Sequence, residues 1–167
     1  LIGGMGNDSI TSGTGNHLIY AHSGNDSIVI NGSGNKTIDG SSGTDSLTIN
    51  YSGITSLGSY TSTISGDYTV LTDSSGNVIQ YKNIESLTVG SYAYTNNTSS
   101  KYFYSASERA VYLYQGGTLS GSNFGSGPFF DLQGTSNNLR IVGSGAVDSV
   151  SMGFSRTGTG AATGNVV

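Results

Sequence analysis

Residues 3–11 read GGMGNDSIT, and the same nine-residue pattern returns in SGTGNHLIY (12–20), AHSGNDSIV (21–29), NGSGNKTID (31–39) and GSSGTDSLT (40–48). One extra residue, Ile30, separates the third line from the fourth. Glycine holds the fourth place of every line, and an aliphatic residue holds the eighth. The first fifty residues are therefore expected to repeat one structural unit five times.

Each line divides into two halves with different physical roles. The glycine-rich half predicts a turn, because glycine adopts backbone angles that other residues avoid and leaves carbonyl oxygens exposed. The second half predicts a short strand whose aliphatic side chain points into the interior. The eighth-place residues are expected to stack as a narrow hydrophobic ladder: Ile10, Ile19, Ile28, Ile38 and Leu47.

The composition also indicates an all-β protein. The 167 residues include 27 glycines, one proline and no cysteine or tryptophan. Only 10% of them are charged, against roughly 25% in ordinary soluble domains. Ile, Leu, Val and Tyr nevertheless recur regularly between the polar clusters, which favours many short strands joined by tight turns over disorder.

Charge and hydropathy exclude several classes of function. A net charge of −4 and six scattered Lys and Arg residues cannot form the basic surface that nucleic acid requires. No stretch approaches the ~18 apolar residues of a membrane span. We expect no signal peptide, because Leu1 and Ile2 lead straight into the first line. The two residues also fit the eighth and ninth places of an earlier line, so the chain is expected to be a piece of a longer protein. Because the chain has no cysteine and so no disulfide, stability outside the cell would depend on another kind of cross-link, such as bound metal.

The repeated pattern resembles the glycine- and aspartate-rich nonapeptide of RTX proteins, a family of secreted bacterial proteins. The resemblance covers residues 1–50. It implies a parallel β-roll, a form of β-solenoid, that binds calcium and here continues into further β-strands of solenoid or sandwich type. Calcium takes six or more oxygen ligands at about 2.3–2.6 Å. In the family, turn carbonyls and Asp carboxylates supply these oxygens.

The sixth place of each line predicts where calcium binds. In a β-roll, successive turns lie on opposite edges, so lines one, three and five share one edge (the odd edge) and lines two and four share the other (the even edge). The odd edge then carries Asp8, Asp26 and Asp45, and the even edge carries His17 and Lys36. A lysine in place of a carboxylate repels a cation. Calcium is therefore expected along the odd edge only.

Carried over place by place, the resemblance implies two calcium sites. The ligands of the first are the carboxylates of Asp8 and Asp26 and the carbonyls of Gly3, Met5, His22 and Gly24. The ligands of the second are the carboxylates of Asp26 and Asp45 and the carbonyls of Ala21, Ser23, Ser41 and Gly43. The alternative is a calcium-free, glycine-rich β-solenoid whose aspartates cap turns, and the sequence leaves it open.

The remaining polar residues of the repeat are expected to be structural. His17 and His22 lack a third ligand at a recognised spacing, so we expect diverged turn residues rather than a transition-metal site. Asn16 and Asn35, on the even edge, are expected to bond their own backbone, as asparagine does in turns.

Residues 51–90 are expected to form a degenerate coil and a hairpin that close the roll. Residues 51–65 suggest a loose connection or distorted coil. Two strands, 67–72 and 77–82, flank a turn at 73–76. Glu85 follows the hairpin and is expected to bond backbone at the end of the coil.

Residues 91–167 form a tyrosine-rich β region in this interpretation. Tyrosines two residues apart share a strand face, and the three pairs are expected to align as an aromatic ladder across three strands. We expect the ladder to close a core that lacks tryptophan, with a platform for polysaccharide as the alternative. Later strands are expected at 129–132, 139–142 and 149–152. The pairs are Tyr92/Tyr94, Tyr102/Tyr104 and Tyr112/Tyr114.

No catalytic motif is evident, and no pair of carboxylates can be argued into general acid–base catalysis. We expect an extracellular, cell-surface structural or adhesive module, such as a surface-layer, adhesin or filament component, that associates with itself or with other surface proteins. The resemblance implies type I secretion and folding outside the cell, where calcium is plentiful. The alternatives are an accessory folding and secretion module of a larger secreted enzyme or toxin, and glycan binding through the tyrosines.

Overall fold

The computed structural model describes residues 1–97, 102–108, 110–113, 118–120, 140–142 and 149–151. Across these residues the chain is all-β except for one short 3-10 turn, η1 (Leu57–Ser59), so the predicted fold class is confirmed at this level. The strands are β1 (Ile2–Met5), β2 (Ser9–Ser12), β3 (His17–Ser23), β4 (Ser27–Ile30), β5 (Lys36–Asp39), β6 (Ser46–Ile49), β7 (Tyr60–Ser65), β8 (Tyr68–Asp73), β9 (Val78–Lys82), β10 (Ser86–Val89), β11 (Tyr92–Asn97), β12 (Tyr102–Ser105), β13 (Ala110–Leu113), β14 (Thr118–Ser120), β15 (Arg140–Val142) and β16 (Ser149–Ser151).

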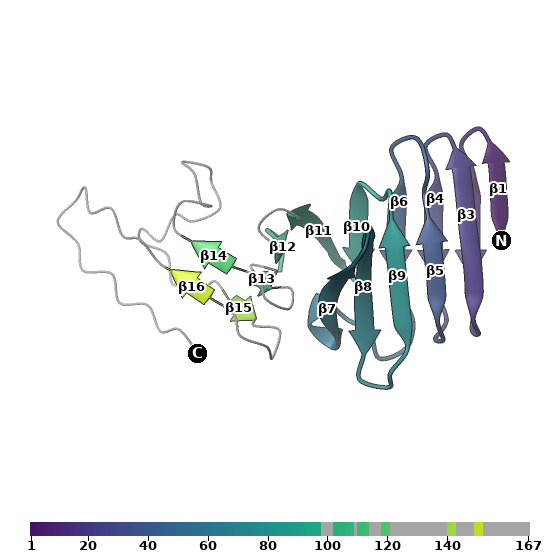
Figure 1. Ribbon diagram of the computed structural model, residues 1–167. Coiled ribbons are helices and arrows are strands. Elements are labelled where there is room, and N and C mark those ends of the chain that lie inside the picture. Colours follow the sequence, from purple (N-terminus) through teal and green to yellow (C-terminus); the bar gives the residue numbers. More distant parts are fainter. Residues whose placement is uncertain (98–101, 109, 114–117, 121–139, 143–148, 152–167) are drawn as a thin grey trace.

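The first six strands alternate between two sheets. One sheet has the order β1-β3-β5-β9-β8-β7, and the other has the order β15-β13-β12-β11-β10-β6-β4-β2. Figure 1 shows the strands β1, β3, β5 and β9 side by side in one layer, with β4, β6 and β10 behind them. Strands from the odd lines of the repeat pair in parallel with one another, and so do strands from the even lines. The reason is that the chain returns to the same sheet after every second turn.

The register aligns the eighth-place aliphatic residues. Ile10 lies opposite Ile28, Ile28 opposite Leu47, and Ile19 opposite Ile38. All five are buried, which confirms the predicted ladder. The core is wider than predicted, because β4 extends to the extra residue Ile30, which pairs with Ser12 on one side and Ile49 on the other. Ile30 and Ile49 are fully buried and form a second apolar row.

Strands β9 and β10 add a further layer to the stack. Strand β9 pairs in parallel with β5, and β10 pairs in parallel with β6, with Leu87 opposite Leu47. The expected hairpin corresponds to β8 and β9, which pair antiparallel across the turn at residues 74–77. Residues 60–65, expected as part of a loose coil, instead form the regular strand β7, antiparallel to β8. This expectation was wrong because the segment is polar in composition and shows no clear strand pattern, although its strand buries Tyr60 and Ser62.

The prediction of a tyrosine ladder was also wrong. In the register of β11, β12 and β13, Tyr104 lies opposite Thr95 and Val111, and Tyr102 lies opposite Asn97 and Leu113. No described tyrosine of one pair therefore faces a tyrosine of the next, because the register is set by burying Phe103.

Two tyrosines of this region are instead held in the core. Tyr94 and Tyr112 are buried, and their rings meet edge to face with centroids 5.9 Å apart. Both hydroxyls donate to the Glu108 carboxylate, and the Tyr94 hydroxyl also accepts the backbone N–H of Leu57 at 2.9 Å. These tyrosines close the interior, as the structural interpretation expects.

Several expectations for the C-terminal region fall outside the described residues. Strands β15 and β16 agree with the expectations for 139–142 and 149–152. Tyr114 and the expected strand 129–132 lie outside the part of the chain that the structure describes. The division into segments 1–50, 51–90 and 91–167 stays a prediction. Within the described residues, we find no helix with the length and apolar character needed to cross a membrane.

Candidate metal centre

The odd edge stacks three segments, residues 3–8, 21–26 and 40–45, and the first two begin in the ends of β1 and β3 before they turn. Backbone hydrogen bonds join them, from Gly6 N–H to the Ser23 carbonyl at 2.8 Å and from Gly24 N–H to the Ser42 carbonyl at 3.0 Å. The even edge stacks residues 13–17 and 31–36 in the same way. The two edges therefore separate the odd and even lines of the repeat.

Positive backbone angles explain the glycine in the fourth place. Gly6, Gly24 and Gly43 have φ values of 101°, 130° and 146°, a region that disfavours any residue with a Cβ. In the second place, His22 and Ser41 have φ values of 74° and 70° although they are not glycine. These two turns keep the geometry of the repeat and bear backbone strain for it.

Aspartate side chains link the turns of the odd edge in a ladder. The Asp8 N–H donates to Asp26 Oδ1 at 2.7 Å, and the Asp26 N–H donates to Asp45 Oδ1 at 2.8 Å. The Asp45 N–H donates to Glu85 Oε2 at 2.6 Å, which confirms that Glu85 bonds backbone at the end of the stack. One oxygen of each acceptor carboxylate is therefore committed to the neighbouring turn.

The second carboxylate oxygens have no such partner. Oδ2 of Asp8, Asp26 and Asp45 is buried and makes no hydrogen bond to any described residue. Burial raises the pKa of the Asp45 carboxyl; the hydrogen bond from the Asp26 N–H opposes the rise, and the charges of Asp26 and Glu85 add to it. A row of buried, unpaired anionic oxygens is costly without a neutralising cation.

Turn carbonyls converge on these oxygens beside two glycines. A Cβ on Gly3 would lie 2.6 Å from the Ala21 carbonyl oxygen and 2.8 Å from Asp8 Oδ2. A Cβ on Gly40 would lie 2.0 Å from the Asn83 carbonyl oxygen and 2.6 Å from Asp45 Oδ2. At both places a carbonyl and an unpaired carboxylate oxygen approach the same small space, a donor pair that suits a hard cation.

The donor set consists of backbone as well as side chains. Among the described residues, no group of three or more His, Cys, Asp and Glu side chains gathers at one point. Any metal on the odd edge therefore depends on turn carbonyls to complete its shell, as the two implied sites do. The turns of residues 3–8, 21–26 and 40–45 bring all the implied ligands to this edge, although the carbonyls of His22 and Ser23 already accept N–H groups of neighbouring turns. A carbonyl oxygen has a second lone pair for a further interaction.

Sequence reasoning missed the fourth turn of this edge. Asn83 supplies the carbonyl beside Gly40, and Glu85 supplies the last acceptor of the ladder. A signal was present, since Glu85-Ser86-Leu87 parallels Asp45-Ser46-Leu47 and the two segments pair residue by residue at serine and leucine.

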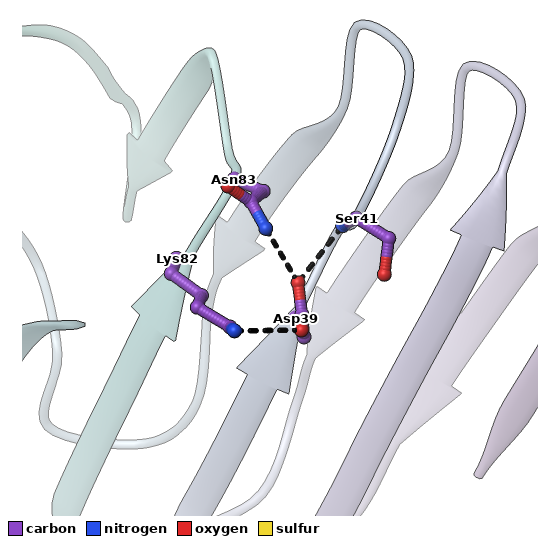
Figure 2. A network of polar contacts seen from close by, with 4 residues as sticks. All are labelled: Asp39, Ser41, Lys82 and Asn83. Carbon is purple, nitrogen blue, oxygen red and sulfur yellow. Dashed lines mark hydrogen bonds and ion pairs between the residues drawn. The ribbon is translucent and has the colours of Figure 1, made fainter. Parts of the chain in front are cut away.

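An ionic network fixes this fourth turn beside the odd edge (Figure 2). Asp39 Oδ1 accepts the Ser41 N–H at 3.0 Å and the Asn83 side-chain amide at 2.7 Å, and Asp39 Oδ2 lies 3.1 Å from Lys82 Nζ. Burial favours a higher pKa for Asp39, but the hydrogen bonds from Asn83, Lys82 and Ser41 together lower it. Asp39 therefore stays ionised and joins the turn at 40–45 to the turn at 83–85.

Comparison with solved structures supports the fold. No family model matches the sequence, and no curated protein matches it. The structure is similar to the crystal structure of extracellular lipase LipA from Serratia marcescens. The TM-score is 0.51 and the sequence identity is 16%, over 90% of this chain and 26% of the lipase. The chain thus spans about a quarter of the lipase's length, and at this identity the likeness shows the fold alone.

The even edge has a different chemistry. Asn16 Oδ1 accepts the Asn35 N–H at 2.9 Å, and Asn35 Oδ1 accepts the Val78 N–H at 2.9 Å. The expectation that these asparagines bond their own backbone was wrong, because stacking brings the N–H of the next turn within reach. His17 Nδ1 lies 2.6 Å from the hydroxyl of Ser12, which is buried. The expected role of His17 as a turn residue agrees with this contact.

Filling the space beside Gly40 is expected to destabilise the odd edge. The Cβ of Gly40→Ala would meet the Asn83 backbone, whereas the Cβ of Gly13→Ala has only Asn31 Oδ1 near it, at 3.9 Å. Neither glycine has a positive φ, so the two variants differ in space rather than backbone strain. Urea unfolding in saturating calcium should show Gly40→Ala less stable by about 1–3 kcal/mol and Gly13→Ala near wild type. Equal stability of the two variants would contradict the crowded geometry.

Proposed function

We propose that this chain forms a calcium-stabilised β-roll of RTX type that serves as an extracellular structural or adhesive module. The observation that carries the proposal is the row of buried, unpartnered Oδ2 atoms on Asp8, Asp26 and Asp45. Their burial is intelligible if a cation lies between the turns, since an isolated carboxylate is otherwise better placed in water.

Calcium fits this donor set better than other common metals. The odd edge offers only carboxylate and carbonyl oxygens, and calcium accepts such hard ligands in flexible geometry. Asp8 and Asp26 would hold one ion and Asp26 and Asp45 a second, with turn carbonyls completing each shell. The bound ions would neutralise the aspartates and cross-link turns that no disulfide joins.

The fold likeness to part of an extracellular lipase supports an extracellular location. Chelation of calcium by stacked turns also suits that location, because a protein that folds only where calcium is plentiful can pass a secretion channel unfolded.

An exposed strand edge supports a role in assembly. Strand β7 ends its sheet within the described residues, so it presents unpaired backbone N–H and C=O groups along one side. Ile64 on this strand is an apolar side chain that is 38% exposed. Such an edge can add a strand from another copy or from a surface partner.

Calcium-dependent assembly tests the structural role. Light scattering with size-exclusion chromatography should show the full chain assembling on addition of calcium and dispersing with chelator. Ile64→Lys should block assembly while leaving the calcium-induced circular dichroism change intact, and Leu18→Lys on the inner strand β3 serves as a matched control, since Leu18 is also an exposed apolar residue. A chain that folds with calcium but stays monomeric at all concentrations would contradict the structural role and leave the calcium site intact.

The second candidate is an accessory folding module of a larger secreted enzyme. It is favoured by the extent of the fold likeness, in which this chain corresponds to about a quarter of a secreted lipase. This candidate requires calcium-dependent folding without assembly, so the same experiment separates the two.

A further inference from the structure

The even edge contains a fully buried lysine. Lys36 occupies the sixth place of its line, where the odd lines carry aspartate, and its exposed fraction is 1%. Lysine is almost never fully buried unless its ammonium is paired. Among the described residues no ion pair involves Lys36, so its charge is balanced by something other than a carboxylate.

Three turn carbonyls take that role. Lys36 Nζ donates to the carbonyl oxygens of Gly15 at 2.7 Å, Ser33 at 3.0 Å and Gly34 at 3.2 Å. An ammonium group has three N–H donors, so all of them are satisfied. Gly15 belongs to one turn of the even edge, and Ser33 and Gly34 belong to the next, so the ammonium bridges two stacked turns.

Positive φ angles at two glycines allow this arrangement of carbonyls. Gly15 and Gly34 have φ values of 113° and 103°, the same left-handed geometry as the fourth-place glycines of the odd edge. A Cβ on Gly34 would lie 2.5 Å from the Gly15 carbonyl oxygen, which shows how closely the two turns approach. The stacking of the two turns therefore brings these carbonyl oxygens together, since the Gly15 N–H also donates to the Ser33 carbonyl at 2.9 Å.

We propose that the carbonyls of Gly15, Ser33 and Gly34 form a cation site and that the Lys36 ammonium is its built-in occupant. The ligands of the site are neutral carbonyl oxygens only. It therefore suits a primary ammonium or another singly charged cation and disfavours a divalent ion. The even edge thereby gains its cross-link from the chain itself and needs no metal ion of its own. This inference does not depend on calcium binding at the odd edge.

Chemical rescue tests the site. Lys36→Ala removes the three methylene groups beyond Cβ and the ammonium, a loss that n-propylammonium matches in shape and charge. Thermal unfolding of the full chain in calcium should show Lys36→Ala and Lys36→Met melting lower than wild type by about 4 °C or more. Millimolar n-propylammonium chloride should raise the Tm of Lys36→Ala and leave that of Lys36→Met unchanged, because the methionine side chain occupies the space of the lysine methylene groups.

Two additives separate a cation site from general effects. Tetramethylammonium has the charge without N–H donors, and 1-propanol has the chain without the charge. Rescue by either to the same extent as n-propylammonium would overturn the proposal, and so would a wild-type Tm for Lys36→Met.

A measurement on the wild-type chain covers the case in which the variants do not fold. In ¹⁵N nuclear magnetic resonance, the Lys36 ammonium should give a signal with slowly exchanging protons, assigned through its Cε. The ammonium of Lys82, which lies at the surface, serves as the reference for fast exchange. Exchange at Lys36 as fast as at Lys82 would overturn the proposal.

Discussion

Removal of calcium is expected to unfold the odd edge and most of the repeats with it. Without the ion, the Oδ2 atoms of three aspartates stay buried and unpaired, and two rows of aliphatic side chains must offset about 1–2 kcal/mol of backbone ordering entropy per residue. Far-ultraviolet circular dichroism should lose most of its β-sheet signal on addition of a calcium chelator and recover it when calcium is restored.

Hydrogen exchange locates the effect. Amides of residues 3–48 should become exchangeable in chelator, with those of the odd turns losing the most protection. Magnesium added to the chelated protein serves as the control, because it prefers a smaller octahedral shell and should not restore the signal. An unchanged spectrum in chelator would contradict calcium as the stabilising ion.

Asp26→Asn is expected to have the largest effect of any single substitution. Asp26 is 2% exposed and lies at the centre of the ladder, where Oδ1 accepts the Asp8 N–H and Oδ2 is unpaired. Asparagine keeps the shape and one acceptor oxygen but removes the charge shared by both implied sites. The calcium concentration at half-maximal folding should rise by at least about tenfold, which corresponds to about 1.4 kcal/mol.

The control for this substitution is Asp67→Asn. It removes the same charge from an exposed residue in the turn between β7 and β8 that is not an implied calcium ligand. Its calcium midpoint should match wild type, as followed by circular dichroism and by isothermal titration calorimetry. Equal calcium affinity in Asp26→Asn and wild type would rule out the implied sites.

The repeat made the stacked part of the fold predictable. A period of nine residues with a fixed glycine and a fixed aliphatic place determines which residues turn and which residues are buried, and parallel pairing follows from the alternation. The same pattern placed the aspartates on one edge. Glu85 was also predictable, since it follows the repeat and shares its position before a serine and a leucine.

Residues outside the repeat were less predictable, for physical reasons. The tyrosine pairs are spaced for a common strand face, but the register of β11 to β13 depends on which side chain enters the core, and Phe103 takes that place. The asparagines bond across turns because a stacked neighbour competes with their own backbone, and a single line of sequence does not contain that neighbour.

The contacts of Lys36 were unpredictable for a different reason. Its position predicts that the even edge lacks calcium, because its charge repels a divalent ion. Its contacts could not be predicted, since a four-carbon side chain reaches either solvent or the interior, and the choice depends on three carbonyls from two turns.

The most direct test is a crystal structure grown in calcium with anomalous scattering data. We expect anomalous peaks on the odd edge, between the turns of Asp8 and Asp26 and between those of Asp26 and Asp45, and none beside Lys36. An odd edge without such peaks in a calcium-saturated crystal would contradict calcium binding by the repeat.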